Sequence, residues 1–235
     1  MLPHKPIIDV IIPAYNEQHA IGLVVSEVPD YIRHIVVVNN NSNDHTKVNA
    51  LEAGAIVVDE PQRGYGRACL SGMAYIKELE VQPEIVVFMD ADYSDYPEEM
   101  TELLSPILNQ GVDFVIGSRV KGKKEKGSMT FPQIFGNWMA TSLMKSIFGA
   151  EYSDLGPFRA IKWEKLLSLD MKDQNYGWTI EMQIKAHQHQ LLFAEVPVNY
   201  KRRIGTSKVS GTLKGTFLAG YKILWTIGKY RISQH

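Results

Sequence analysis

The sequence has a single cysteine, Cys69, among its 235 residues. One thiol excludes an internal disulfide and a metal cluster held by several thiolates, so we expect Cys69 to be a small buried apolar side chain. Charge of one sign is not in excess either, because 25 Lys and Arg balance 26 Asp and Glu for a formal net charge of −1. Nucleic acid is therefore not the expected partner.

Long hydrophobic runs are also missing from the sequence. No stretch has the uninterrupted apolar length that a membrane-spanning helix needs. Residues 1–6, ahead of the first expected strand, contain no apolar signal segment. We therefore expect a cytoplasmic location, with peripheral contact at the inner face of a membrane left open. The sequence has no internal repeat, low-complexity segment or linker, which favours one domain over two small ones.

Short apolar runs alternate with stretches of helical spacing through the first half of the chain. The expected strands are residues 7–12, 35–38, 55–58, 85–89 and 114–116. Such alternation predicts a Rossmann-like α/β fold with a mostly parallel sheet flanked by helices. The composition, 45% apolar and 22% charged, is that of an ordinary globular protein.

The second half of the chain is less regular. Helical spacing over 133–148 and 178–189 and an apolar run over 192–198 predict two helices and a strand. An apolar stripe with interspersed lysines predicts a C-terminal amphipathic helix near 212–230, either packed on its own domain or bound at a membrane interface. Trp138 and Trp163 are expected in the core.

Polar residues follow the expected strands at the points where the strands end. Asp90 and Asp92 follow the fourth strand, residues 13–17 the first, 39–44 the second and 63–66 the third. The carboxyl ends of parallel strands meet at one edge of a sheet, where open α/β folds bind ligands. An aromatic ring, amides, a Gly-softened backbone beside an Arg, and two carboxylates predict a nucleotide-diphosphate pocket with a divalent cation.

The same motifs carry a resemblance to a known family. Pro-Ala-Tyr-Asn-Glu at 13–17, Asp-Ala-Asp at 90–92 and Gly-Ser-Arg at 117–119 resemble family 2 glycosyltransferases of GT-A fold. The segments 154–159, 195–198 and 203–208 resemble the D-x-x-S-G-F-R, E-x-P-V and R-x-G-x-S-K motifs of dolichyl- and polyprenyl-phosphate sugar synthases. The resemblance spans about residue 7 to residue 210, and the ordered set is more specific than any single motif.

The resemblance implies a role for each matching residue. Asp90 would contact ribose or metal, and Asp92 would be the principal ligand of a Mg²⁺ or Mn²⁺ ion that bridges the diphosphate. Arg203 would close over the diphosphate together with Ser207 and Lys208. The donor-binding set implied is Pro13, Ala14, Tyr15, Glu17, Asn40, Arg63, Gly64, Asp90, Ala91, Asp92, Arg203, Ser207 and Lys208.

Three departures from the family pattern stand out in the sequence. Asn40 occupies a place where the family usually has an Asp that reads the base, so uracil and guanine both remain open. Ser94 stands two residues beyond the metal-binding Asp, where the family often has a Gln. The Ser94 hydroxyl is a weaker ligand, and Asp95 could compensate for it. Pro157 replaces a Gly and stiffens the turn on the acceptor side.

The acceptor decides whether the reaction needs a general base. A hydroxyl acceptor would need one, and the candidates are Glu181 and Asp154. A lipid phosphate is already anionic and would instead need cations, for which Arg119, Arg159 and Lys123 of the basic loop 121–126 are available. The alternatives are a solvated surface loop for 121–126 and, for Glu181, an ordinary helix ion pair with the residue four positions on.

The resemblance therefore implies an inverting, metal-dependent transfer of a sugar from a nucleotide-diphosphate donor, with UDP favoured and GDP-mannose second, to a polyprenyl or dolichyl phosphate. The expected catalytic residues are Asp92, Arg203 and one of Glu181 or Asp154. Residues 1–119 would form the nucleotide-binding half, 120–211 the acceptor-side half and 212–235 the terminal helix. A hydroxyl acceptor and a catalytically silent nucleotide-sugar-binding protein are the alternatives.

Overall fold

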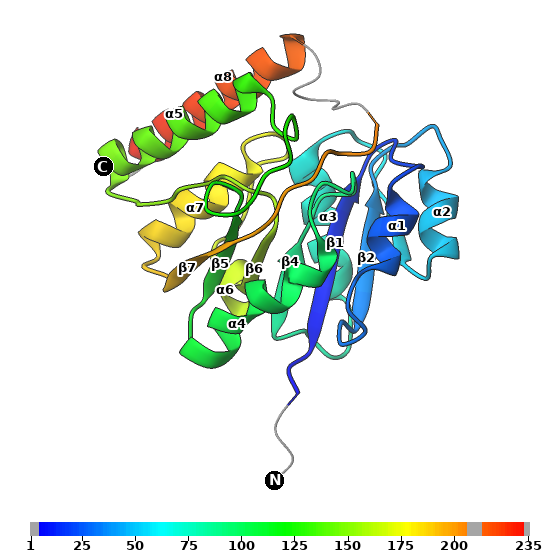
Figure 1. Cartoon of the computed structure of the whole chain (residues 1–235). Helices are drawn as coiled ribbons and strands as arrows, with labels where there is room; N and C mark the ends of the chain where they lie inside the picture. Colours follow the sequence, from blue (N-terminus) through cyan, green and yellow to red (C-terminus); the bar gives the residue numbers. More distant parts are fainter. Residues whose placement is uncertain (1–4, 206–212, 233–235) are drawn as a thin grey trace.

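The computed structural model describes residues 5–205 and 213–232, with the side chains of the last helix described from residue 220 onward. Seven strands form a sheet in the order β3-β2-β1-β4-β6-β5-β7. Helices flank the sheet, and a long helix pair lies beyond one end of it (Figure 1). This arrangement confirms the predicted α/β class with a mostly parallel sheet and a C-terminal helix.

The first four strands form the regular part of the sheet. They are β1 (Ile8–Ala14), β2 (His34–Asn39), β3 (Ile56–Asp59) and β4 (Ile85–Phe88). They pair with one another in parallel. The connecting helices are α1 (Ile21–Ser26), α2 (Thr46–Glu52) and α3 (Tyr65–Lys77). Strand β2 lies on one side of β1 and β4 lies on the other, so the strand order reverses between β1 and β4. Open α/β sheets bind ligands at such a point.

The far side of the sheet contains the exception to parallel pairing. Strand β6 (Arg159–Lys162) is antiparallel to both β4 and β5 (Phe114–Ser118), and β7 (Phe193–Pro197) is parallel to β5. The remaining helices are η1 (Pro97–Glu99), α4 (Met100–Gln110), α5 (Phe131–Phe148), α6 (Trp163–Ser168), α7 (Trp178–Gln188) and α8 (Leu213–Ile232). The sequence analysis had not predicted α6.

Both faces of the sheet are buried. Val10 and Ile12 point into one apolar cluster and Ile11 into the other, which explains the continuous apolar run of β1. Helix α3 lies close to β1 because Gly72 has no side chain: a Cβ there would meet Ile11 Cγ2 at 2.7 Å. Cys69 on α3 is buried, as predicted.

Helix α5 is a well-delimited helix with an unexpected surface. A capping box between Thr130 and Gln133 begins it, and Gly149 ends it in the left-handed conformation with φ 74°. Trp163 is buried as predicted, but the prediction for Trp138 was wrong, because α5 leaves this side chain 63% exposed. None of the described helices is long and apolar enough to cross a membrane.

Candidate functional site

A cleft of about 550 Å³ opens at the carboxyl edge of the sheet, above the ends of β1 and β4. Its lining comprises Pro13, Ala14, Tyr15, Glu17, Asn40, Arg63, Gly64, Tyr65, Ala68, Asp90, Ala91, Asp92, Arg119, Pro132, Gln133, Gly136, Asn137, Leu155, Asn175, Tyr176, Thr179, Tyr200, Arg203, Gly220 and Ile223. Every donor-site residue predicted within the described part of the chain is among them. The structure thus brings these residues together, while their roles in binding stay predictions.

Asp92 is held at the base of the cleft by its own turn and by a crossing segment. The backbone N–H and the hydroxyl of Ser94 donate to Asp92 Oδ1 at 2.9 and 2.5 Å. Arg203 lies across the turn because the Ile204 N–H donates to the Asp92 carbonyl at 2.9 Å. The Arg203 Nη2 lies 2.9 Å from Asp92 Oδ2 and 3.3 Å from Glu17 Oε1. Arg203 therefore joins the loops after β1 and β4.

Asp90 and Asp95 add two more carboxyl groups beside Asp92. The Tyr65 hydroxyl donates to Asp90 Oδ1 at 3.1 Å. Burial and the neighbouring Asp92 raise the pKa of Asp90 to about 7. Asp95 is 2% exposed, and neither of its carboxylate oxygens has a hydrogen-bond partner in the described part of the chain. Burial beside Asp90 and Asp92 also raises the pKa of Asp95 well above its usual range.

These carboxylates suit a hard divalent cation that also binds phosphate oxygens. Among the described residues, no three His, Cys, Asp or Glu side chains are arranged to hold a metal ion by themselves. Mg²⁺ in phosphate-transfer sites is commonly bound through one or two carboxylates, water and substrate phosphates, so Asp90 and Asp92 fit such an ion. The unpartnered oxygens of Asp95 and the unpartnered Nε of Arg203 show that the polar groups here are not fully satisfied by the described chain.

Another part of the cleft lining has an aromatic surface. The Arg63 guanidinium lies over the ring of Tyr15, with its Cζ 4.4 Å from the ring centroid. Both side chains line the cleft. A planar ring and a planar cation are surfaces on which a nucleobase stacks.

The Asn40 side chain, which departs from the family pattern, is committed to the neighbouring loop. Its Nδ2 donates to the carbonyls of Glu60 and Gln62 at 3.3 and 2.7 Å, and its Oδ1 accepts from the Gly64 N–H at 2.8 Å. An amide can both donate and accept, whereas an ionised Asp could not donate to these two carbonyls. Asn40 therefore shapes the loop that carries Arg63.

The sequence analysis missed the segment 172–177, which forms one wall of the cleft through Asn175 and Tyr176. This segment packs tightly on the loop after β3. A Cβ added to Gly66 would lie 2.0 Å from the Asp173 carbonyl oxygen, and one added to Gly64 would lie 2.2 Å from that of Gln174. The two glycines in the loop were the available signal for this close approach.

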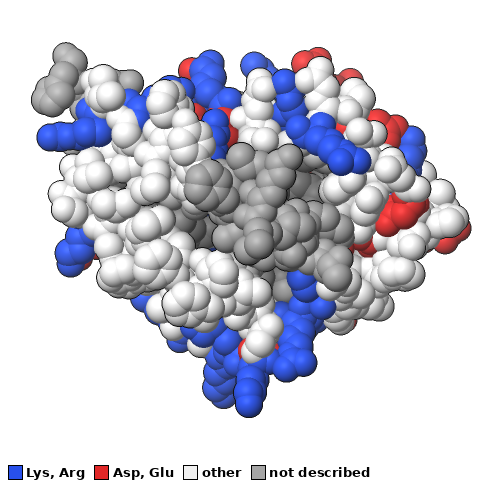
Figure 2. All heavy atoms as spheres, turned by 90° about the horizontal axis from the view of Figure 1, so that it is seen from above, with Lys and Arg blue, Asp and Glu red and all other residues white. Residues whose placement is uncertain are grey.

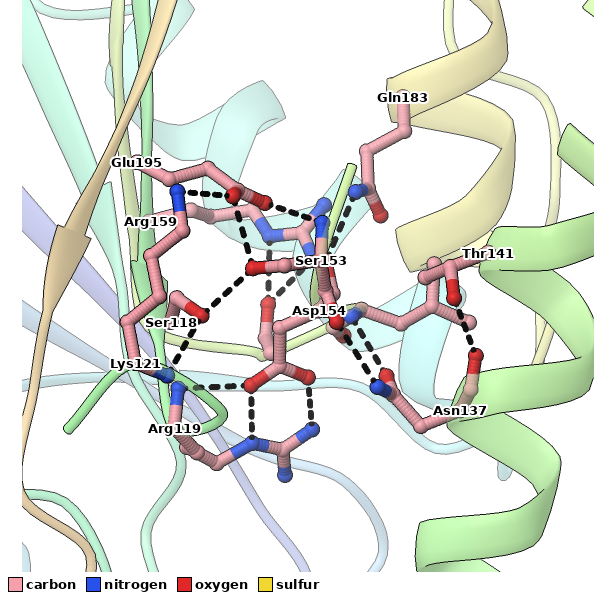
Figure 3. A network of polar contacts seen from close by, with 12 residues as sticks. Ser118, Arg119, Lys121, Asn137, Thr141, Ser153, Asp154, Arg159, Gln183 and Glu195 are labelled. Atoms are coloured by element: carbon pink, nitrogen blue, oxygen red, sulfur yellow. Dashed lines mark hydrogen bonds and ion pairs between the residues drawn. The ribbon is translucent and has the colours of Figure 1, made fainter. Parts of the chain in front are cut away.

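Asp154, a candidate base, is fully buried. Its Oδ1 accepts from Arg119 Nη2 at 2.6 Å, and its Oδ2 accepts from the Nε and the backbone N–H of Arg119 (Figure 3). Burial alone would lower the pKa of Arg119, but Asp154 raises it above its usual value. Arg119 faces the cleft, whereas Asp154 is outside its lining and engaged on both oxygens.

Arg159 is not available to an acceptor, so its predicted role as an acceptor-binding cation was wrong. It is completely buried, and its guanidinium donates to the carbonyls of Leu155, Gly156 and Thr179 (Figure 3). Burial lowers its pKa to about 10. The sequence could not reveal this, because an Arg that ends a turn is equally suited to an exposed phosphate and to buried carbonyls.

Glu181 lies outside the cleft, in a second small cavity of about 210 Å³ beneath α8. It is 1% exposed and accepts from the backbone N–H groups of Lys172 and Asp173 and, at 2.5 Å, from the Tyr230 hydroxyl. Lys185 Nζ lies 2.9 Å from its Oε1. The ion pair with the residue four positions on is present, but it is buried within α7 instead of facing solvent. The Tyr230 hydrogen bond joins the same carboxylate to α8.

Of the three remaining predicted residues, the structure describes only Lys123. Lys123 is exposed and outside the cleft lining, as are Lys124 and Lys126. Ser207 and Lys208 lie outside the described residues.

Asn137 is another cleft residue that the sequence analysis missed. Its Nδ2 donates to the Ser153 carbonyl at 3.1 Å, and its Oδ1 accepts from the Leu155 N–H at 2.8 Å (Figure 3). It thereby fixes the turn before Pro157 against α5. The signal in the sequence was an amide beside Trp138 in a mainly apolar helix.

The sequence model of Glycosyl transferase family 2 matches residues 9–167, which is more than half of the chain. The chain is a family 2 glycosyltransferase. The sequence is 31% identical over 215 residues to an uncharacterised glycosyltransferase of Mycobacterium tuberculosis, covering 90% of this chain and 94% of that one. It is 30% identical over 206 residues to a dolichyl-phosphate hexose transferase of Haloferax volcanii, covering 85% of each.

Another relative of this glycosyltransferase is a UDP-N-acetylglucosamine–dolichyl-phosphate N-acetylglucosaminyltransferase of Methanococcus voltae. It is 28% identical over 233 residues, covering 87% of this chain and 92% of the relative. Among solved structures, the glucosyl-3-phosphoglycerate synthase of Mycobacterium tuberculosis, in complex with Mn²⁺, UDP and phosphoglyceric acid, superposes with a TM-score of 0.76. At 23% identity, covering 96% of this chain and 78% of that one, this likeness shows the shared GT-A fold.

Proposed function

We propose that this glycosyltransferase moves a sugar from a UDP-sugar to a polyprenyl or dolichyl phosphate, with inversion and with a bound Mg²⁺ or Mn²⁺. The observation that carries the proposal is that Asp90, Asp92 and Arg203 line the same cleft as the Tyr15–Arg63 stack. A stacking surface for a base and carboxylates for a cation, in one cleft, suit a nucleoside diphosphate.

The donor end supplies charge stabilisation for the leaving group. As the acceptor oxygen bonds to the anomeric carbon, the bond to the diphosphate oxygen breaks and negative charge develops there. A divalent cation on Asp90 and Asp92 would offset that charge when bound. Arg203 would break its ion pair with Asp92, which frees the Asp92 carboxylate for the cation. The Arg203 guanidinium would then turn to the diphosphate. UDP is favoured as donor because one relative uses a UDP-sugar and one structural neighbour binds UDP.

A phosphate acceptor is favoured over a hydroxyl because no described carboxylate is placed to act as its base. The cleft-lining carboxylates are Glu17, Asp90 and Asp92, all on the donor side. Asp154 is paired with Arg119, and Glu181 lies in a different cavity. A phosphate is already anionic and would be met by the Arg119 guanidinium, which faces the cleft. Two relatives act on dolichyl phosphate.

The test compares one lipid with and without its phosphate. Purified enzyme is given UDP-glucose, UDP-N-acetylglucosamine or GDP-mannose, with Mn²⁺ or EDTA, and either a polyprenyl phosphate or the free polyprenol. We expect metal-dependent product from a UDP-sugar and the phosphate alone. Product from the polyprenol at a comparable rate would support the hydroxyl acceptor instead.

Binding separates the enzyme from a silent binding protein. UDP with Mn²⁺ should raise the melting temperature, because a ligand specific to the native state stabilises it. The same shift with no turnover of any UDP- or GDP-sugar would overturn the proposed reaction and support a nucleotide-sugar-binding protein. A shift with GDP and not with UDP would overturn the proposed donor.

A further inference from the structure

Helix α5 exposes a continuous stripe of large apolar side chains. Phe131, Ile134, Phe135 and Trp138 have the spacing of one helix face and are 78%, 50%, 48% and 63% exposed. The rings form a ladder, with centroids 6.3 Å apart for Phe131 and Phe135 and 5.8 Å apart for Phe135 and Trp138. Soluble proteins seldom expose contiguous apolar surface of this kind unless it binds something.

The stripe lies beside the entrance to the cleft. Gln133, Gly136 and Asn137, which alternate with the stripe along α5, line the cleft. The buried residues of α5 are Asn137, Ala140, Thr141 and Met144. A molecule seated on the exposed side of α5 would therefore lie next to the acceptor entrance.

Helix α8 has a second group of exposed apolar side chains. It packs beside α5 (Figure 1). Tyr221, Leu224 and Trp225 of α8 are 58%, 44% and 57% exposed, while Gly220 and Ile223 line the cleft. We call the exposed residues Phe131, Ile134, Phe135, Trp138, Tyr221, Leu224 and Trp225 the α5–α8 face.

The charge of these two helices is of one sign. Helices α5 and α8, 18 and 20 residues long, contain five Lys and Arg and no Asp or Glu, although the whole chain has a net charge of −1. The loop that precedes α5 adds the exposed Lys123, Lys124 and Lys126, with one exposed acid, Glu125, among them. Seen from above, the described surface over α5 and α8 is largely uncharged, with basic side chains around its margin (Figure 2).

We propose that the α5–α8 face binds the surface of an anionic lipid bilayer. Trp and Tyr favour the interface between water and lipid, and Lys side chains around an apolar surface reach the anionic headgroups. A protein partner or a second copy would not require the one-sided basic charge. The proposal rests on the proposed function, since a bilayer on this face would place an acceptor's phosphate at the cleft entrance.

Vesicle flotation tests the proposal directly. The full chain is mixed with vesicles of phosphatidylcholine alone or with about one third phosphatidylglycerol. We expect binding to the anionic vesicles and at least about tenfold weaker partitioning for the double variant Phe135→Ser/Trp138→Ser. The control, Val81→Ser/Leu192→Ser, removes apolar side chains of similar exposure, 55% and 63%, from segments that precede β4 and β7, and should float like the unmodified protein.

Two readouts keep this inference separate from the proposed reaction. The Phe135→Ser/Trp138→Ser variant should keep the thermal shift with UDP and Mn²⁺ and its turnover of a short, water-soluble prenyl phosphate, while losing turnover of a long-chain lipid in vesicles. Equal flotation of this variant and the unmodified protein would overturn the inference. Absence of flotation, together with a dimer that the variant dissociates, would instead identify the face as a contact between copies.

Discussion

Two groups of buried carboxylates in this molecule differ in how they are satisfied. In the first, here called the closed cluster, Asp154, Asp173 and Glu181 each have a cation of their own, at 2.6, 2.9 and 2.9 Å. In the second, the open cluster of Asp90, Asp92 and Asp95, the one ion pair with a described residue is that of Asp92 with Arg203, at 2.9 Å. Asp95 has no described hydrogen-bond partner at all.

The difference separates structure from ligand binding. A buried carboxylate whose oxygens are all engaged by the chain holds elements together, as Glu181 does for α7, α8 and the segment 172–177. Carboxylates crowded without matching donors are costly, and they are retained where a ligand supplies the missing charge. The comparison therefore favours Asp92 over Glu181 as the residue that carries chemistry.

The largest expected effect comes from the open cluster. Asp92→Asn should lower turnover by about 10² to 10³-fold, because the substitution removes the principal charge that would hold the cation. The fold should remain, since relief of repulsion with Asp90 offsets the weakened pair with Arg203. Initial rates at saturating donor and Mn²⁺ measure this effect, and Asp170→Asn, on a side chain that is 72% exposed, serves as the control. Unchanged turnover in Asp92→Asn would show that Asp92 does not hold a metal ion that the reaction needs.

The next effect concerns the closed cluster. Glu181→Gln should lower the free energy of unfolding by about 3 kcal/mol, because it leaves the buried Lys185 ammonium without its counter-charge. Tyr230→Phe, which removes one donor to the same carboxylate, should cost about 1 kcal/mol. Urea unfolding measures both variants.

Glu164→Gln is the matched control for that pair of variants. Glu164 pairs with Lys165 at 3.5 Å, and its side chain is 76% exposed, so its loss should change stability by less than about 0.5 kcal/mol. If Glu181→Gln instead kept full stability while losing turnover and one limb of the pH–rate profile, Glu181 would be a general base and the comparison would fail.

A smaller effect tests the connection between the two clusters. The segment 172–177, anchored by Glu181, touches the loop that carries Arg63 and Tyr65. Gly66→Ala places a Cβ 2.0 Å from the Asp173 carbonyl oxygen, so one of the two cleft walls must move. We expect about tenfold weaker binding of UDP with Mn²⁺ by calorimetry.

Gly22→Ala is the control for that substitution, because its nearest neighbour would be the Asn49 carbonyl oxygen at 4.0 Å. Equal donor affinity in the two variants would show that the segment 172–177 has no part in shaping the donor site.

The last effect is a pH dependence of stability in the absence of metal. The pKa of Asp90 is raised from 3.8 to about 7 by burial and by Asp92, so the folded chain holds a proton that the unfolded chain has released. Between these values the free energy of unfolding should fall as pH rises. Urea unfolding from about pH 4.5 to pH 7.5 should show a shallower fall in Asp90→Asn than in the unmodified protein. Parallel curves for the two proteins would contradict the raised pKa.

The donor side of the site was predictable from the sequence to a large extent. Its residues follow parallel strands, and strand topology alone brings Tyr15, Asn40, Arg63 and Asp90 to one edge. The acceptor side was not. Arg159 and Trp138 were assigned to the wrong environments, and the turn that contains Asp154 forms its contacts with residues distant in the sequence, such as Arg119.

The sequence alone determined the strand–helix alternation, the carboxyl-edge site and the family, because each depends on local apolar runs and on short motifs at strand ends. Tertiary structure alone decided which charges are satisfied. The long-range packing of α5, α7 and α8 decides whether an Arg side chain faces solvent or donates to buried carbonyls. It also decides whether a Glu carboxylate is accessible or fully hydrogen-bonded, and no local pattern encodes either outcome. The same packing left Phe131, Phe135 and Trp138 on the surface beside the cleft.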